Sequence, residues 1–343
     1  MAKPQGSPPK IKDVAAHAGV SVTTVSRVLN GHPYVREELR AKVDAAIEEL
    51  GYSPSSIARS LVRSGTDLIG VIVPDITTSF FSTILGSIEQ TASSRGYALL
   101  VSNIAENSEK ELRYLKLFKG LRVAGIIVMH EPTTPAMRRF VATIGIPLVV
   151  SSARPSGLLD VSVNIDDEAA AYDATSYLAG LGHRRIALIG GNAERLQTAR
   201  MRYDGYERAL KEARIAVDPA FVKVGDFKTQ DGYRLMGELL AAKRKRPTAV
   251  FALSDDMAAG AMNRALDEGL RVPEDVSIMG FDDSALASIT RPALTTVHQP
   301  IADIGSISVE TLIRSIEGTV PSSDGIILKH RIVERSSCAR RPA

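Results

Sequence analysis

Apolar residues at helical spacing begin a few residues into the chain. In the first such stretch they share one helix face: Ile11, Val14, Ala15 and Ala18. Gly19 interrupts the stretch, and Ser21 can cap a second helix that ends after Asn30 at Gly31. The side chains of the second helix that can face the first are Val25, Val28 and Leu29. Two short helices joined by a tight turn containing glycine predict a helix-turn-helix.

A third amphipathic stretch follows, and it is complete by Tyr52. Its apolar positions can cover the first two helices: Val35, Leu39, Val43, Ala46, Ile47 and Leu50. We therefore predict a three-helix head over residues 10–52, behind a disordered tail at residues 1–9.

From residue 67 onward, short β-rich apolar runs alternate with amphipathic helical stretches. The candidate strands form two groups of four: 68–74, 97–103, 123–130 and 147–152, then 185–191, 221–226, 249–255 and 276–283. Such alternation predicts parallel βαβ units. The predicted fold class is α/β with an all-α N-terminal head, and the large domain is expected to form two lobes of doubly wound parallel sheet. Ligands bind at the carboxyl ends of the strands in such sheets, which predicts a cleft between the lobes.

Composition narrows the class of protein. The chain has 343 residues, 44% of them hydrophobic and 24% charged, as in an ordinary soluble globular protein. No run of about 18 apolar residues and no secretory signal is present, so we expect a cytoplasmic protein without a membrane partner. Cys338 is the only cysteine, which excludes an internal disulfide and a thiolate zinc cage. We expect neither a metal nor a cofactor.

The net positive charge is confined to the first 64 residues. That segment holds nine Lys and Arg against six Asp and Glu, whereas the two signs balance in the rest of the chain. A polyanionic partner such as nucleic acid is the direct interpretation, because phosphate contacts depend on Lys and Arg. A solvated surface with a chance excess of three charges is the alternative.

The outward face of the second helix favours DNA over mere helix packing. With Val25 directed inward, the residues that point outward near the helix start are Val22, Thr23, Ser26 and Arg27. A recognition helix meets base edges at this position. Arg27 can pair with guanine, and the methyl groups of Val22 and Thr23 suit thymine.

The segment IKDVAAHAGVSVTTVSRVLNG, followed by VREELRAKVDAAIEELGYSPSSIARSL, resembles the DNA-binding head of the lactose and galactose repressor family. The resemblance implies that Val22, Thr23 and Arg27 read bases, while Ser21, Ser26 and Asn30 contact phosphate or support them. We also expect Ile11 to contact DNA.

Residues 53–66 are expected to form the hinge of this family. Ser53 or Ser55 could cap a short helix there, and its expected DNA contacts are Ser55, Ala58, Arg59 and Leu61. The resemblance implies that the helix forms on DNA, pairs with its dimer mate and wedges Leu61 into the minor groove. The alternative is an ordinary linker with one buried leucine.

The resemblance extends over residues 67–337, through LGHRRIALIGG, RYDGY, VPEDVSIMGFDD and RPALTTVHQP. It implies a large domain similar to type I periplasmic sugar-binding proteins, with an effector between the lobes. The family's effector positions fall on Phe80, Phe81, Ser152, Arg202, Phe227, Ser254 and Asp282. Arg202 and Asp282 could grip a polyol through charge-assisted hydrogen bonds. The pair could instead form a salt bridge between the lobes, and the three phenylalanines could be core residues.

Three serines at two sites depart from the family pattern and leave the effector unidentified. Relatives often carry an aspartate where this chain has Ser151 and Ser152, and Ser254 replaces an asparagine. We expect the first lobe to comprise about 67–164 with 299–323, and the second 165–298 with 324–338.

The prediction is a homodimeric, sequence-specific repressor that binds palindromic double-stranded operator DNA and is modulated by a small molecule, most simply a carbohydrate. The first rival is a cytoplasmic sugar-binding protein without operator specificity. The basic head argues against it, because such a protein needs no basic head. An enzyme with an accessory DNA-binding domain is the second. It lacks support because no phosphate loop, zinc motif or nucleophile elbow occurs. The pairs Asp255–Asp256 and Asp282–Asp283 are better explained as ligand contacts and helix caps than as catalytic carboxylates.

Overall fold

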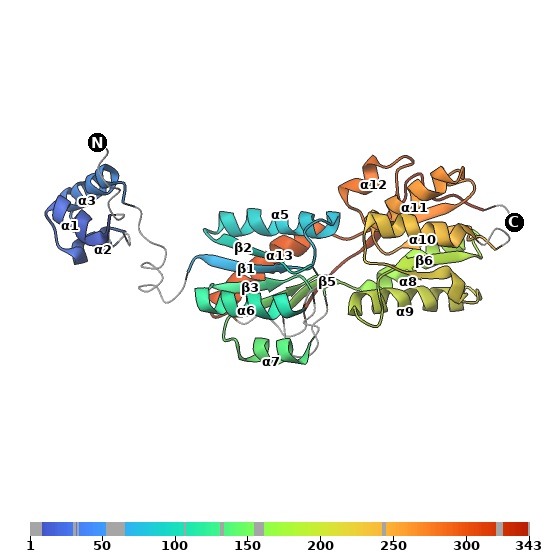
Figure 1. The fold of residues 1–343 in the computed structure, drawn as a ribbon, viewed down its shortest axis with the longest axis horizontal. Coiled ribbons are helices and arrows are strands. Elements are labelled where there is room, and N and C mark those ends of the chain that lie inside the picture. Colours follow the sequence, from blue (N-terminus) through green and yellow to red (C-terminus); the bar gives the residue numbers. More distant parts are fainter. Residues whose placement is uncertain are drawn as a thin grey trace, which may run out of the picture. The chain divides into compact units, whose positions relative to one another are not determined.

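The computed structural model describes residues 9–29, 32, 34–52, 66–105, 108–130, 134–153, 161–241, 245–319 and 325–341. The chain divides into two compact units, residues 1–66 and 67–343. Three helices make up the described part of the smaller unit, and the larger unit contains two sheets with their covering helices (Figure 1).

The smaller unit is a three-helix domain with its own core. Its helices are α1 (Ile11–Ala18), α2 (Val22–Leu29) and α3 (Glu37–Leu50). Gly19 ends α1 with a left-handed φ of 65°, which permits the tight turn into α2. The buried core side chains are Val14, Ala15, Val25, Val28, Val43, Ala46 and Tyr52. Leu39, which was predicted to join this core, is half-buried and lies outside it. The predicted helix-turn-helix is confirmed.

The first sheet of the larger unit has six parallel strands in the order β11-β5-β4-β3-β1-β2. They are β1 (Leu68–Val73), β2 (Ala98–Asn103), β3 (Gly125–Val128), β4 (Leu148–Ser151), β5 (Ser162–Ile165) and β11 (Ile326–Leu328). Helices α5 (Ser79–Ser94) and α13 (Ile301–Ile316) share one apolar core with the sheet. Helices α6 (Ser108–Leu121) and α7 (Pro135–Thr143) share another, so both faces are covered.

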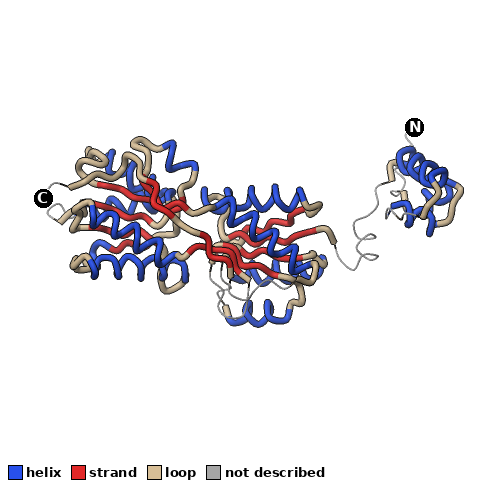
Figure 2. Tube along the Cα trace, turned by 180° about the vertical axis from the view of Figure 1, so that it is seen from behind, coloured by secondary structure: helices blue, strands red, loops and turns tan. Residues whose placement is uncertain are grey.

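The second sheet has the order β12-β10-β9-β8-β6-β7, and only β12 runs antiparallel to its neighbour. Its strands are β6 (Ile186–Gly190), β7 (Val222–Val224), β8 (Ala249–Ala252), β9 (Ser277–Asp282), β10 (Thr295–His298) and β12 (Arg331–Val333). The helices around it are α8 (Asp167–Gly180), α9 (Gln197–Glu212), α10 (Thr229–Ala241), α11 (Asp255–Asp267) and α12 (Ala285–Ile289), with the 3-10 turn η1 (Pro219–Phe221). Figure 2 shows helices on either side of each set of strands.

All eight predicted strands are present, and the two-lobed α/β fold is confirmed. Four further strands were missed: β5, β10, β11 and β12. They are three or four residues long, and β5 and β10 are rich in polar residues, so periodicity alone does not reveal them.

The chain passes between the sheets at slightly different points from those predicted. Strand β5 lies wholly in the first sheet and ends at Ile165, one residue beyond the predicted boundary. Strand β11 pairs with β5, and the chain reaches the second sheet only at β12. The predicted return to the second lobe at residue 324 is therefore too early. Sequence alone could not place it, because β11 is only three residues long and tertiary contacts decide which strand it pairs with. Among the described residues, no helix is long and apolar enough to span a bilayer.

Candidate DNA-binding surface and effector site

Helix α2 presents a polar and apolar mixture to solvent close to its start. Val22, Thr23 and Arg27 are exposed, whereas Val25 and Val28 are buried in the head core. Val22 has 40% of its surface exposed although it is apolar. Ser26 is half-buried. The face expected to read bases is thus turned away from the core.

Ser21 caps α2 as predicted, because its Oγ accepts a hydrogen bond from the Thr24 amide at 3.1 Å. Ile11 is half-buried and packs against the head core, so much of its side chain is used in folding. Five of the expected DNA contacts lie outside the described residues: Asn30, Ser55, Ala58, Arg59 and Leu61.

In the first lobe, the aromatic candidates lie in the first turn of α5. Phe80 and Phe81 are half-buried at the edge of the core, with ring centroids 5.2 Å apart in an edge-to-face arrangement. Ser152 follows β4 with a left-handed φ of 67°. Its Oγ is buried and has no hydrogen-bond partner among the described residues. A buried unpartnered hydroxyl is costly, which makes Ser152 a candidate ligand contact.

In the second lobe, Phe227 and Ser254 follow strand ends. Phe227 has a φ of 60° and its ring lies over Gly191, where an added Cβ would come within 2.3 Å of Cε2 of the ring. Ser254 caps α11 by accepting a hydrogen bond from the Met257 amide at 3.2 Å. Its hydroxyl proton is not used by that bond and could be donated to a ligand.

Arg202, on α9, is buried among three fixed groups. Its Nε donates to Asp167 Oδ1 at 2.8 Å, and Nη1 donates to the Leu253 carbonyl at 2.7 Å. The guanidinium also stacks on Phe281, 3.7 Å from the ring centroid. These contacts lie within the second lobe, so the alternative of a salt bridge between the lobes does not hold for Arg202.

Asp282 ends β9 and is almost completely buried. Its Oδ1 accepts a hydrogen bond from Gln299 Nε2 at 2.7 Å. Burial raises the pKa of Asp282 well above its ordinary value; the charge of Asp255 adds to the rise, and the charge of Arg202 opposes it. Arg202 stacks on Phe281, the residue directly before Asp282, and no hydrogen bond joins the Arg202 and Asp282 side chains.

The paired carboxylates have separate structural partners. Asp255 accepts hydrogen bonds from the amide and hydroxyl of Ser284 and from the Thr296 hydroxyl, and burial raises its pKa to about 7. Asp283 accepts from His298 and Arg335. The predicted helix cap of α11 is neither aspartate but Ser254.

The carboxyl ends of the two sets of strands meet through polar contacts. The Ser79 amide and hydroxyl donate to Asp256 at 3.3 and 3.2 Å. Lys228 Nζ lies 3.5 Å from Asp75 Oδ2. Ser79 adjoins Phe80 and Lys228 adjoins Phe227, so these contacts between the lobes border the candidate effector positions.

Two important residues were missed at the sequence level. Gln299 holds Asp282, and Asp167 holds Arg202. Gln299 lies within the RPALTTVHQP motif, and Asp167 stands at the start of a helix after a β-like run, but nothing in either pattern names its partner. Within the described part of the chain, no three His, Cys, Asp or Glu side chains are placed to hold a metal ion.

Two family models match the sequence. Residues 10–55 match the bacterial regulatory proteins of the lacI family, and residues 175–338 match a periplasmic binding protein-like domain. Together they cover the helix-turn-helix and most of the second lobe.

Known proteins resemble the chain over almost its full length. Catabolite control protein A of Priestia megaterium is 38% identical over 327 residues, which are 95% of this chain and 98% of the relative. The Lac repressor dimer bound to operator and the anti-inducer ONPF superposes with a TM-score of 0.85 at 29% identity, covering 97% of this chain and 100% of that one. A complex of the transcriptional regulator CelR with cellobiose gives a TM-score of 0.71 at 31% identity, covering 96% and 99%.

Proposed function

The chain belongs to the LacI family of DNA-binding transcriptional regulators, and we propose that it is a repressor whose affinity for its operator is set by a small molecule bound in the large domain. The DNA half of the proposal rests on one observation above all. Helix α2 buries Val25 and Val28 and leaves Val22, Thr23 and Arg27 exposed near its start. In a helix-turn-helix these positions meet base edges in the major groove.

The effector half rests on the polar groups at the strand ends of the second lobe. Arg202 is fixed by Asp167 and Leu253 through its Nε and Nη1, which leaves its Nη2 for a ligand, and Asp282 keeps one oxygen beyond its bond with Gln299. A charged donor and a carboxyl acceptor suit the hydroxyl groups of a sugar. The CelR relative is described with cellobiose, which supports a carbohydrate as the class of effector.

Dimer formation is part of the proposal, because one head contacts one half-site and a palindromic operator has two. The Lac repressor relative is described as a dimer on operator. Exposed apolar side chains on β2 and α6 offer surface to a second copy: Val101, Leu117 and Leu121.

Selection from random duplex DNA tests the proposal. The purified protein should retain a palindromic sequence, and Arg27→Ala should reduce discrimination at one base pair by about 1 to 3 kcal/mol, or roughly 5- to 150-fold. Lys42→Ala, which removes an exposed head cation from α3, serves as the control. It should weaken binding to all sequences alike, if at all.

The same selection, repeated with a panel of mono- and disaccharides and nucleobases, tests the effector. A molecule that changes retention of the selected site supports the proposal. Retention that depends on salt but not on sequence, with or without the panel, would refute operator-specific regulation.

A further inference from the structure

The turn after β9 has an unusual backbone at the proposed effector carboxylate. Asp282 has a φ of 119° and Asp283 a φ of 58°, so two consecutive side-chain-bearing residues occupy the region that favours glycine. Such conformations persist only where the surroundings hold them, and they cluster at binding sites. The contacts that hold this turn therefore bear on how Asp282 points.

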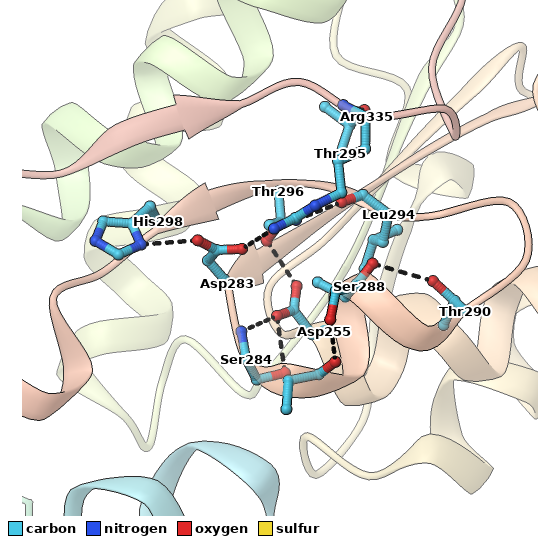
Figure 3. A network of polar contacts seen from close by, with 12 residues as sticks. Asp255, Asp283, Ser284, Ser288, Thr290, Leu294, Thr295, Thr296, His298 and Arg335 are labelled. Carbon is cyan, nitrogen blue, oxygen red and sulfur yellow. Dashed lines mark hydrogen bonds and ion pairs between the residues drawn. The ribbon is translucent and has the colours of Figure 1, made fainter. Parts of the chain in front are cut away.

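The Asp283 side chain is held by contacts with two segments of the second lobe. Its Oδ2 lies 2.8 Å from His298 Nδ1 on β10, and its Oδ1 accepts from Arg335 Nη2 at 2.6 Å (Figure 3). Arg335 is itself fixed, because its Nη1 donates to the Leu294 carbonyl and its amide donates to Thr295 Oγ1, both at 2.9 Å. The carboxylate thus ties the turn to a rigid strand and to the segment after β12.

The next residue, Ser284, is held by hydrogen bonds to a second carboxylate, that of Asp255. Asp255, in the first turn of α11, accepts from the Ser284 amide at 2.7 Å and from its hydroxyl at 3.0 Å. The other oxygen of Asp255 accepts from the Thr296 hydroxyl at 2.6 Å. Asp255 is completely buried, so these bonds are screened little by solvent.

We propose that Asp283 and Asp255 are positioning residues that hold Asp282 in the orientation in which it binds effector, with Arg335 as the anchor of Asp283. This proposal rests on the proposed function, since Asp282 needs a fixed direction only if it meets a ligand. Among the described residues, Gln299 donates the one hydrogen bond that the Asp282 side chain accepts. A single side-chain bond leaves the backbone free to turn, whereas the two carboxylate grips fix the residues that follow Asp282.

A double-mutant cycle between Asp282 and Asp283 tests, without any ligand, whether Asp283 holds Asp282 in place. Asp282→Asn should raise the urea midpoint of unfolding, because it removes a carboxyl group that is buried near Asp255. In an Asp283→Asn background the turn can relax and expose Asp282, so the same substitution should raise the midpoint by less than half as much. Arg335→Lys keeps a cationic donor for Asp283 and should preserve most of the coupling.

Asp283→Gly guards against a folding failure, because glycine accepts a φ of 58° while removing the grip. Asp275→Asn is the matched control, since Asp275 pairs with Arg271 on an exposed surface of the same lobe. It should leave the effect of Asp282→Asn unchanged. Strict additivity of Asp282→Asn with both Asp283→Asn and Asp283→Gly would overturn the proposal.

Effector affinity gives the second measurement. With a panel molecule that binds the wild-type protein, Asp283→Asn should weaken binding at least tenfold, and Arg335→Lys should weaken it less. Equal affinity for wild type and Asp283→Asn would refute the positioning role while leaving the regulator function intact. If no panel molecule binds the wild type, the effector proposal fails, and the cycle still decides whether the grip on Asp282 exists.

Discussion

At the level of a single residue, Glu111 is unusual because its carboxyl group is buried without hydrogen bonds from the described residues. It lies in the first turns of α6 with 1% of its surface exposed, and neither carboxyl oxygen has a hydrogen-bond partner among the described residues. His130 Nε2 is 3.3 Å from Oε1. Burial raises the pKa of Glu111 to about 8.

This shift predicts a pH-dependent difference between the wild type and Glu111→Gln. The folded state keeps the proton up to about pH 8, whereas the unfolded carboxyl, with its ordinary pKa of 4.5, loses it near pH 4.5. Wild-type stability should therefore fall as pH rises between these values, by up to about 1.4 kcal/mol per pH unit. Glu111→Gln removes this loss, so its advantage should grow from pH 5 to 8 and then level off.

Urea unfolding at several pH values measures that difference. Glu109→Gln, on the exposed side of the same turn, is the control and should follow the wild-type profile. Parallel profiles for wild type and Glu111→Gln would show that burial does not hold the proton on Glu111.

At the level of elements, glycines set how closely the helices of the second lobe approach. A Cβ added at Gly260 of α11 would lie 1.9 Å from the Thr229 carbonyl oxygen, and one at Gly232 of α10 would lie 2.0 Å from that of Met257. The two helices thus pack backbone against backbone. Leu and Ala periodicity predicts that these helices are amphipathic but does not reveal this contact.

Gly260→Ala should therefore destabilise the large domain by about 3 kcal/mol, because neither backbone can move away cheaply. Gly86→Ala, in the exposed face of α5 with no atom within 4 Å of the added Cβ, is the matched comparison. It should stabilise by about 0.5 to 1 kcal/mol through reduced chain entropy. Denaturant midpoints distinguish the two, and a Gly260→Ala protein as stable as wild type would contradict the close packing.

At the level of the whole large domain, the contact of Asp256 with Ser79 joins the two lobes. Two hydrogen bonds to one carboxylate are worth on the order of 1 to 3 kcal/mol when partly buried. Asp256→Ala should therefore widen the distribution of distances between the lobes in the absence of ligand.

Spin labels on Gln90→Cys and Lys211→Cys, in a Cys338→Ser background, report the distance between the lobes. Double electron–electron resonance measures the distribution of that distance. Both label sites are exposed, one in each lobe. Asp275→Ala, whose partner Arg271 lies in the same lobe, is the control. An unchanged distribution in Asp256→Ala would mean that other contacts hold the lobes together.

The sequence by itself determined the local features of this protein. The three head helices, the cap at Ser21 and the outward face of α2 follow from spacing and side-chain type within a few residues, because helix periodicity is a local property. Eight strands and the two-lobed fold follow for the same reason, since each strand is a short continuous run bounded by helices.

Tertiary structure alone decided the partners. That Arg202 pairs with Asp167, that Gln299 holds Asp282 and that β11 joins β5 are contacts between residues far apart in the chain. The burial of Glu111 belongs with them, because its sequence neighbours Glu109 and Lys110 are charged and only the packed fold excludes water from its side chain. Charge pairing and burial depend on which surfaces meet, and that is fixed by the whole fold rather than by any one segment.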